Sequence, residues 1–193
     1  MLAIRNFGHF WSREHVNWGS PAWGKRGTLD GYVMRDRKPY VVDFREQMGI
    51  YVLFTQSREV VYVGQVGSGD RRLGLRLADH TKNHLRDRWH YFSWFGLKQA
   101  KVNGGTLSEQ QGTETHSLGT NAEALDEIEA ILIQLFEPRL NKQGPRWGSD
   151  TEEFLQYIPA EWEKEKSPVT NEDVYDALIT STSSILKAVK ELE

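Results

Sequence analysis

Cysteine is absent from this 193-residue sequence, which excludes a disulfide framework and a metal site built from thiolates. No stretch approaches the ~20 consecutive apolar residues that a membrane-spanning helix requires. The first ten residues also lack the apolar segment of a signal peptide. We therefore expect a soluble protein that resides in the cytoplasm and has no membrane partner.

Aromatic residues, by contrast, are plentiful. The chain holds 7 Trp, 7 Tyr and 8 Phe, and 38% of its residues are hydrophobic, which is enough for a packed core. The length suits one domain with extensions. Residues 1–44 mix aromatic and basic side chains, which predicts either a segment anchored on the core by tryptophan or a surface that grips nucleic acid.

Charge is distributed unevenly along the chain. Residues 1–101 carry 17 Lys/Arg and 9 Asp/Glu, a net charge of +8, whereas residues 102–193 carry 7 and 18, a net charge of −11. A basic first half suits a polyanionic partner such as DNA. The acidic second half would repel nucleic acid unless it faces away. A merely solvated surface is the alternative interpretation of these charges.

Two strand-like runs joined by a polar turn at 56–59 predict a β-hairpin. The turn places Leu53 opposite Tyr62. Two residues further from the turn, Tyr51 lies opposite Gly64. The two tyrosines then share a face as diagonal neighbours, with Cβ atoms roughly 7 Å apart. The other face is expected to be core and consists of Ile50, Val52, Phe54, Val61 and Val63.

A helix is predicted over residues 71–87, and a strand follows at 89–97. Arg76 and His80 are four residues apart and share a face of this helix. An isolated arginine at such a position is usually a surface residue. The nearby His84 and His90 are rivals of His80 for any role in a site.

Glu129 lies in a second predicted helix, which begins at residue 120 or 121 and ends at Glu137, before Pro138. Helical spacing places it in an apolar stripe, where a carboxylate costs several kcal/mol unless it is paired or binds a metal. A divalent cation is the preferred partner, and one carboxylate suits a water-rich Mg²⁺ site. The alternatives are an ion pair with Arg76 and a glutamate whose carboxylate extends to the surface. The stripe comprises Leu125, Leu132, Ile133 and Phe136.

Taken in order, these residues resemble the GIY-YIG nuclease family over about residues 45–143. Five elements in order, at family-like spacings, make a specific signal. The chain departs from the family at Gln65, where many members carry a lysine soon after the second motif. This departure argues against activation assisted by a lysine and makes His80 the preferred candidate for that role. The matching elements are Gly49-Ile50-Tyr51, Tyr62-Val63-Gly64, Arg76 with His80, Glu129, and Asn141 three residues after Pro138.

The resemblance implies a Mg²⁺-dependent (or Mn²⁺-dependent) DNA endonuclease. Tyr51 would take the proton of the attacking water, Arg76 would grip the phosphate, and Glu129 would hold the metal. Tyr62 and His80 would line the site and orient water or phosphate. Asn141, which could instead merely cap a turn, would fix the phosphate or an active-site loop. Restriction, phage defence and mobile-element cleavage are the settings we expect.

The predicted fold is an α/β nuclease domain with a small central antiparallel sheet of about three strands flanked by helices. We expect an aromatic and basic N-terminal extension at 1–44, the nuclease domain at 45–147, and an acidic, largely helical extension at 148–193. A short helix is expected near 152–157. The last helix, over 171–192, would dock on the domain or form a homodimer or other protein contact.

Double-stranded DNA is the expected partner, and basic residues after the hairpin extend its predicted footprint. A solvated face is the alternative role for these charges. Two other functions remain open. The chain could be a non-catalytic subunit that binds nucleic acid or takes part in assembly, or it could be a nuclease that acts on RNA or in DNA repair. The predicted phosphate contacts are Arg71, Arg72, Lys82, Arg86 and Arg88.

Overall fold

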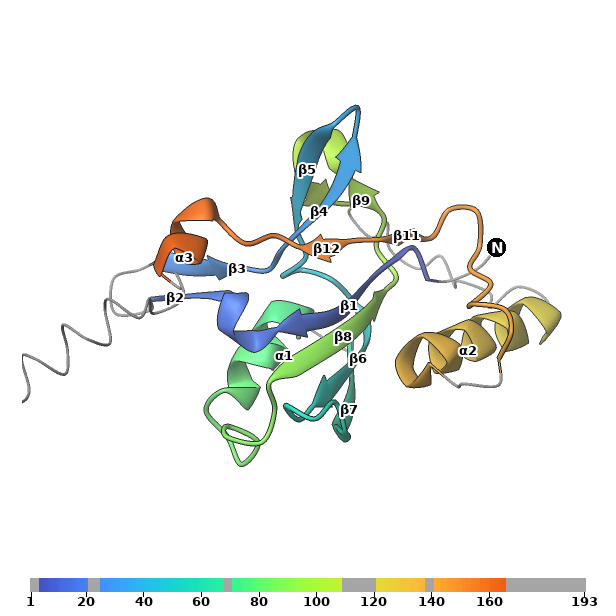
Figure 1. Cartoon of the computed structure of the whole chain (residues 1–193), viewed down its shortest axis with the longest axis horizontal. Helices are drawn as coiled ribbons and strands as arrows, with labels where there is room; N and C mark the ends of the chain where they lie inside the picture. The colour runs from blue at the N-terminus through green and yellow to red at the C-terminus, as the bar shows by residue number, and fades with distance from the viewer. Residues whose placement is uncertain (1–3, 21–24, 68–70, 109–120, 138–140, 166–193) are drawn as a thin grey trace, which may run out of the picture. The chain divides into compact units, whose positions relative to one another are not determined.

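The computed structural model describes residues 4–20, 25–67, 71–108, 121–137 and 141–165. Its main element is a five-stranded mixed sheet with the strand order β11-β1-β8-β6-β7 (Figure 1). All neighbouring strands are antiparallel except β11, which runs parallel to β1. The strands are β1 (Asn6–Ser12), β6 (Gly49–Phe54), β7 (Val60–Val66), β8 (Tyr91–Gly96) and β11 (Glu152–Glu153).

The predicted hairpin is present as β6 and β7, and its register is confirmed as far as Leu53, after which a bulge pairs Phe54 with Val60. Tyr51 pairs with Gly64, and Leu53 pairs with Tyr62. The predicted strand at 89–97 is β8, which pairs with the other side of β6. The three predicted strands therefore lie side by side, with β6 between β7 and β8.

Three smaller sheets surround the central one. β4 (Asp30–Arg35) lies between β5 (Lys38–Asp43) and β12 (Leu155–Gln156). A hairpin joins β2 (Asn17–Ser20) to β3 (Lys25–Thr28), and another pairs β9 (Ala100–Lys101) with β10 (Thr106–Leu107). Short 3₁₀ turns cover Arg13–His15 and Val102–Gly104. Residues 152–157 form β11 and β12, so the helix expected there is wrong.

The main core lies on the tyrosine face of the sheet. Tyr51 pairs with Trp94 and therefore shares its face, and both side chains are fully buried. Ile50 pairs with Phe95 on the opposite face, where α2 packs. The expectation that this opposite face is the core holds for Val52 and Phe54, which are buried. It is wrong for Ile50, Val61 and Val63, which are exposed.

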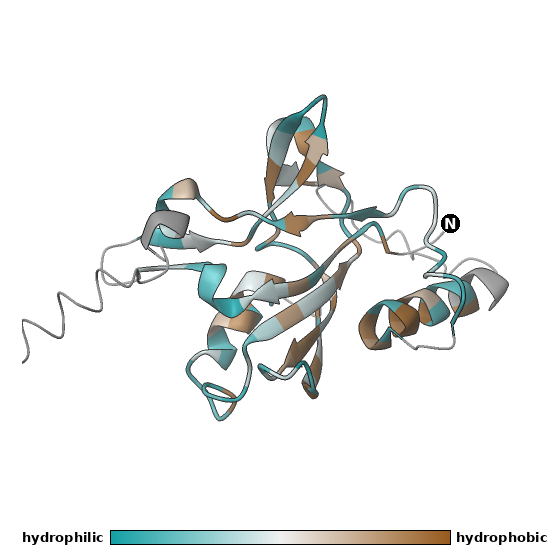
Figure 2. Ribbon diagram, in the orientation of Figure 1, coloured by the Kyte–Doolittle hydropathy of each residue, from teal (hydrophilic) through white to brown (hydrophobic). Residues whose placement is uncertain are grey.

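Three α-helices are present among the described residues. α1 (Leu73–His80) is shorter than the predicted 71–87, because residues 81–88 form consecutive turns. It buries Leu73 and Leu77 in the main core. α2 (Asn121–Phe136) agrees with the predicted helix, and α3 covers Ala160–Glu165. Figure 2 shows strongly hydrophobic residues along β7 and on α2.

The predicted fold class is wrong. The chain is predominantly β-structure, with a five-stranded mixed central sheet and several smaller sheets. The physical reason lies at both ends of the predicted domain. Phe7 and Trp11 of β1 are buried in the sheet interior, and β1 pairs with β8 and β11. The N-terminal aromatic segment therefore completes the central sheet.

The chain divides into two compact units, Met1–Tyr157 and Ile158–Glu193. The predicted boundaries at 44/45 and 147/148 stay predictions. The helix and dimer contact predicted for 171–192 lie outside the described residues. Within the described part of the chain, no helix is long and apolar enough to cross a membrane.

Candidate active site

Gly64 provides the space in which the Tyr51 ring lies. A Cβ placed on Gly64 would lie 2.3 Å from the Tyr51 hydroxyl oxygen, well inside van der Waals contact. Tyr51 has no solvent-exposed surface and packs within the main core. A glycine within a strand commonly marks such a close approach. The Tyr51–Gly64 pairing therefore fixes where the phenol lies.

Helix α1 brings two further predicted residues to this face. Arg76 and His80 are separated by one helical turn, and burial of Leu73 and Leu77 fixes the rotation of the helix. The His80 ring centroid lies 4.9 Å from that of Tyr62 and 5.8 Å from that of Tyr51. The two tyrosine rings are 6.0 Å apart.

These four side chains, Tyr51, Tyr62, Arg76 and His80, form what we call the tyrosine cluster. The Tyr51 hydroxyl lies 2.7 Å from His80 Nε2. Arg76 donates a long hydrogen bond of 3.5 Å to the Tyr62 hydroxyl. Tyr51 and His80 are buried, whereas Tyr62 and Arg76 are partly exposed. The cluster thus has a buried half and a half that solvent can reach.

The hydrogen-bond network assigns the tautomer of His80. Asn83 Oδ1 accepts the backbone N–H of Leu85 at 2.9 Å, so the amide nitrogen of Asn83 faces His80 Nδ1 at 3.0 Å. An amide nitrogen only donates, which makes Nδ1 the acceptor and places the proton on Nε2. His80 Nε2–H then donates to the Tyr51 oxygen. That oxygen receives a hydrogen bond and keeps its own proton free to donate.

Burial shifts the pKa values of Tyr51 and His80 in opposite directions, whereas the charge of Arg76 lowers both. Burial raises the pKa of Tyr51 well above its ordinary value, Tyr62 adds to the rise, and Arg76 opposes it. Burial lowers the pKa of His80, and the positive charge of Arg76 lowers it further. His80 is therefore neutral at pH 7, which agrees with its assigned tautomer. Tyr51 is a protonated phenol unless its proton is drawn away.

We expect the stability of the protein to fall as the pH drops from 7.5 to 5.5, partly through His80. Its pKa is lowered in the folded state, so the unfolded chain, titrating near 6.5, binds more protons in this range. Each unit of decreasing pH then favours unfolding. Urea unfolding at the two pH values should show a smaller pH dependence for His80→Gln than for wild type. His90→Gln, a change at an exposed histidine, should leave the dependence unchanged, and equal slopes in all three proteins would contradict the assignment.

The structure places Glu129 on an exposed face of α2, so the predicted burial of its apolar stripe is wrong. Leu125, Leu132 and Phe136 are 66%, 48% and 60% exposed. The buried carboxylate of this helix belongs to Glu127, which accepts the backbone N–H of Ile4 at 2.9 Å. Since α2 packs on the sheet face opposite the tyrosines, the structure does not bring Glu129 to the cluster.

Asn141 is exposed and also lies apart from the tyrosine cluster. It lines a separate hollow of about 300 Å³ together with residues from the end of α2 and from 142–145.

The predicted phosphate contacts lie on or near α1, and most of them are exposed to solvent. Arg71, Lys82, Arg86 and Arg88 are exposed, and Arg72 is partly exposed. These side chains lie on or next to the same helix and turns that position Arg76 and His80.

The tyrosine cluster contains no carboxylate, and the described residues contain no group of three His, Cys, Asp or Glu that could hold a metal. Glu129 is exposed on α2 and is not a contact of the cluster. Among the described residues, the cluster itself therefore supplies no carboxylate ligand for Mg²⁺, and no chemical step below is derived from a metal.

The sequence patterns did not indicate the roles of two polar residues. Asn83 contacts His80, and Glu127 is buried on α2. Asn83 lies three residues after His80, in a stretch predicted to be helical, where an asparagine usually faces solvent. Only the turn at 81–88 directs its amide to the imidazole. Glu127 and Ile131 are four residues apart and therefore share a face of α2, which is a signal for the burial of Glu127. Its partner, the N–H of Ile4, is remote in sequence and has no such signal.

Comparisons with known proteins add no relative: no family model, curated protein or solved structure matches this chain. The functional argument therefore rests on the geometry of the tyrosine cluster and on the order of its residues in the sequence.

Proposed function

We propose that this chain is a nuclease that hydrolyses DNA phosphodiester bonds at the tyrosine cluster, in keeping with its resemblance to GIY-YIG nucleases. One observation carries the proposal. The Tyr51 hydroxyl lies between His80 Nε2, 2.7 Å away on the buried side, and Tyr62 with Arg76 on the accessible side. Residues from two strands and a helix converge on one phenolic oxygen. A purely structural tyrosine needs only one hydrogen-bond partner.

Arg76 is the phosphate-binding group in this proposal. Its guanidinium remains largely accessible, and its described hydrogen bond, to Tyr62, is long at 3.5 Å. The planar fork of an arginine matches two oxygens of a phosphate and neutralises the charge that develops during hydrolysis. Tyr62, beside it, would contact the same phosphate or the water that attacks it.

The two phenols would remove the proton of the attacking water. Tyr51 first loses its proton to solvent hydroxide by way of Tyr62. Tyr62 then accepts the proton of the attacking water while its own proton moves to the Tyr51 phenolate, and the leaving DNA oxygen takes a proton from solvent. His80 Nε2–H and the charge of Arg76 stabilise the Tyr51 phenolate, and the Nε2–H exists because Asn83 occupies Nδ1. The raised pKa of Tyr51 makes this base strong but scarce at neutral pH, so cleavage should accelerate as the pH rises above 7.

Divalent-cation dependence remains part of the proposal through Glu129, the carboxylate that the family resemblance assigns. Its exposure leaves it free to bind a hydrated Mg²⁺, a cation that typically uses one or two carboxylates and retains several waters. Support from the geometry is limited to that accessibility.

Glu129 and Glu127 provide a matched pair of substitutions on one helix. We expect Glu129→Ala to change the free energy of unfolding by no more than about 0.5 kcal/mol and to lower Mg²⁺-dependent cleavage at least tenfold. Glu127→Ala should instead destabilise the fold by about 1–3 kcal/mol, because it leaves the buried N–H of Ile4 without its acceptor. Urea unfolding and a cleavage assay measure both effects. Unchanged Mg²⁺-dependent cleavage in Glu129→Ala would show that Glu129 does not hold the cation.

A non-catalytic nucleic-acid-binding protein is the second candidate function. Complete burial of Tyr51 and the lack of a carboxylate in the cluster favour it, while the accessible Arg76 and the exposed basic residues around α1 would serve DNA binding equally well. In that case the Tyr51–His80–Asn83 chain would only brace α1 against the hairpin.

A nicking assay separates these two functions. Purified full-length protein is incubated with supercoiled plasmid and, in parallel, with structured RNA, each with Mg²⁺ or with EDTA. The nuclease proposal predicts open-circular or linear plasmid with Mg²⁺ and intact plasmid with EDTA. Retarded but uncut plasmid would identify a binding protein. Cleavage of the RNA alone would redirect the substrate assignment.

A further inference from the structure

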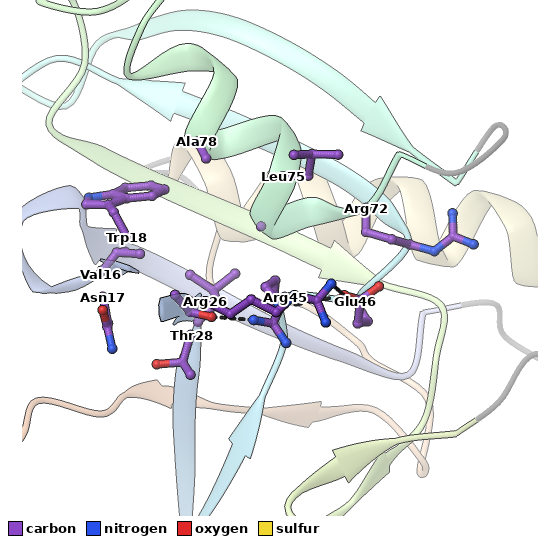
Figure 3. Close-up of a pocket in the computed structure, with 13 residues that line it drawn as sticks. Val16, Asn17, Trp18, Arg26, Thr28, Arg45, Glu46, Arg72, Leu75 and Ala78 are labelled. Carbon is purple, nitrogen blue, oxygen red and sulfur yellow. Dashed lines mark hydrogen bonds and ion pairs between the residues drawn. The ribbon is translucent and has the colours of Figure 1, made fainter. Parts of the chain in front are cut away.

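A pocket of about 260 Å³ lies on the other side of α1 from the tyrosine cluster, against the β2–β3 hairpin (Figure 3). Its size is close to the lower end of the usual range for small-molecule sites, roughly 300–1,000 Å³. Residues of β2, β3, the segment after β5, and α1 all contribute to its walls. None of them belongs to the tyrosine cluster, so the pocket is a separate feature.

One end of the pocket is aromatic and apolar. Trp18 lies there opposite Leu75 and Ala78 of α1, as Figure 3 shows. The indole is held in place because its N–H donates to the Arg13 carbonyl at 3.2 Å and its edge packs on Trp89. Leu75 is 54% exposed, so its side chain is accessible to a ligand in the pocket. A flat ring inserted between Trp18 and Leu75 would cover both.

The other end of the pocket is cationic. Arg26 and Arg72 line it, and the Arg26 side chain is 80% exposed, with only a 3.8 Å contact to Glu46. Arg45 forms part of the floor, where it donates to the Gly27 carbonyl and pairs with Asp43 and Glu46. Arg45 is thus neutralised by its own partners. Arg26, with its highly exposed side chain, is the charge that a ligand would meet first, and Arg72 lines the same pocket.

Two glycines allow neighbouring atoms to approach the backbone closely at the pocket. A Cβ placed on Gly74 of α1 would lie 2.2 Å from Arg45 Cγ, so the glycine lets the arginine stem pass beneath the helix. A Cβ on Gly27 would lie 2.2 Å from the Asn17 carbonyl oxygen, which keeps the two strands of the hairpin tightly apposed. The pocket therefore has a defined floor and wall.

We propose that this pocket binds a single unstacked nucleotide, with the base against Trp18 and the phosphate at Arg26. A nucleotide joins a flat ring to an anion, so the ring would meet the aromatic end of the pocket and the anion its cationic end. The side chains of Asn17 and Thr28 also line it and supply hydrogen-bonding groups for a base edge or sugar. Base stacking on an aromatic residue beside a basic surface is the common mode of single-strand binding. As a nucleotide of the DNA substrate, the ligand rests on the proposed function.

The indole N–H of Trp18 provides a reporter that does not depend on cleavage. Its ¹H–¹⁵N resonance in the full-length protein is assigned by its loss in Trp18→Phe. Deoxyadenosine monophosphate, titrated without divalent cations, should shift this resonance saturably, and inorganic phosphate should not, because it lacks the ring. No saturable shift with the nucleotide, or the same shift with phosphate alone, would overturn the proposal.

Three variants locate the ligand. Ala78→Leu fills the apolar end and should weaken nucleotide binding tenfold or more. Arg26→Ala should weaken it about fivefold, because a charge-assisted contact with the phosphate is lost. Lys25→Ala removes the same charge from the adjacent exposed position, which does not line the pocket, and should leave binding unchanged. Equal weakening in Lys25→Ala and Arg26→Ala would indicate diffuse electrostatics and contradict a built site.

Two oligonucleotides identify the source of the nucleotide. A single-stranded octamer that shifts the Trp18 resonance, when a blunt hairpin duplex does not, shows that the pocket takes an unpaired nucleotide of a strand. A shift with the mononucleotide alone assigns a free nucleotide. Because no arm measures cleavage, nucleotide binding by a protein that fails to nick plasmid would sustain the pocket and refute only the nuclease.

Discussion

Replacing Arg76 by alanine is expected to lower DNA cleavage by about a hundredfold or more, the usual cost of removing one group that stabilises developing charge. The side chain is the accessible cation of the tyrosine cluster and also the positive charge that favours a Tyr51 phenolate. Its loss therefore removes phosphate binding and weakens the base together. Single-turnover cleavage of a labelled duplex, with protein in excess, measures the effect on the bound complex.

Lys38→Ala is the matched control, since Lys38 is an exposed cation on β5 and shares no contact with the cluster. It should cleave at the wild-type rate. Arg76→Lys keeps the charge and loses the planar fork, so an intermediate rate is expected. A wild-type cleavage rate in Arg76→Ala would show that hydrolysis, if it occurs, uses a different phosphate-binding group.

Gly64→Ala is expected to abolish cleavage and to destabilise the protein by about 1–3 kcal/mol, the usual cost of overpacking a core. The new methyl group would lie 2.3 Å from the Tyr51 hydroxyl oxygen, so the fully buried ring would have to move within the packed core. Displacement of the ring would also break its 2.7 Å contact with His80. Urea unfolding and the cleavage assay report the two effects separately.

Gly144→Ala serves as its control, because a Cβ at Gly144 meets nothing within 4 Å. Stability and cleavage should both stay at wild-type values in that variant. A Gly64→Ala protein that unfolds and cleaves like wild type would mean that Tyr51 is not held against Gly64, and the geometry of the cluster would be wrong.

The hairpin and its register could be predicted because they are local. A strand alternates sides every residue, so the turn and the spacing of Tyr51 and Tyr62 settle which residues face each other. The one-turn separation of Arg76 and His80 is equally local. The sequence of the hairpin does not indicate which face of the sheet is covered by the rest of the chain. The tyrosine face is buried by Trp11, Trp94 and Phe44, which come from three distant segments.

The error at Glu129 has a related cause. Helix α2 carries apolar residues on two sides, one through Leu125, Leu132 and Phe136 and the other through Ile131 and Leu135. Periodicity identifies both stripes and cannot choose between them. The choice is made by Phe7, Phe95 and Trp147, which pack against the second stripe. The carboxylate that becomes buried is consequently Glu127.

The fold class was missed because β1 has no sequence feature that distinguishes it from an embellishment. Asn6–Ser12 contains a glycine, a histidine and a bulge between Gly8 and Trp11, so its alternation is broken. A Cβ on Gly8 would overlap the indoles of Trp11 and Trp94. That glycine is needed only because tertiary packing brings two tryptophans over it, which no local pattern contains.

The most direct test of the central claim is single-turnover DNA cleavage by wild type and Tyr51→Phe under conditions where both bind DNA equally. This substitution removes one oxygen atom and keeps the buried ring, so a packing role would leave function unchanged. We predict that Tyr51→Phe folds, binds DNA as wild type does, and cleaves at least a hundredfold more slowly. Equal cleavage rates for the two proteins would contradict the assignment of Tyr51 to the chemistry.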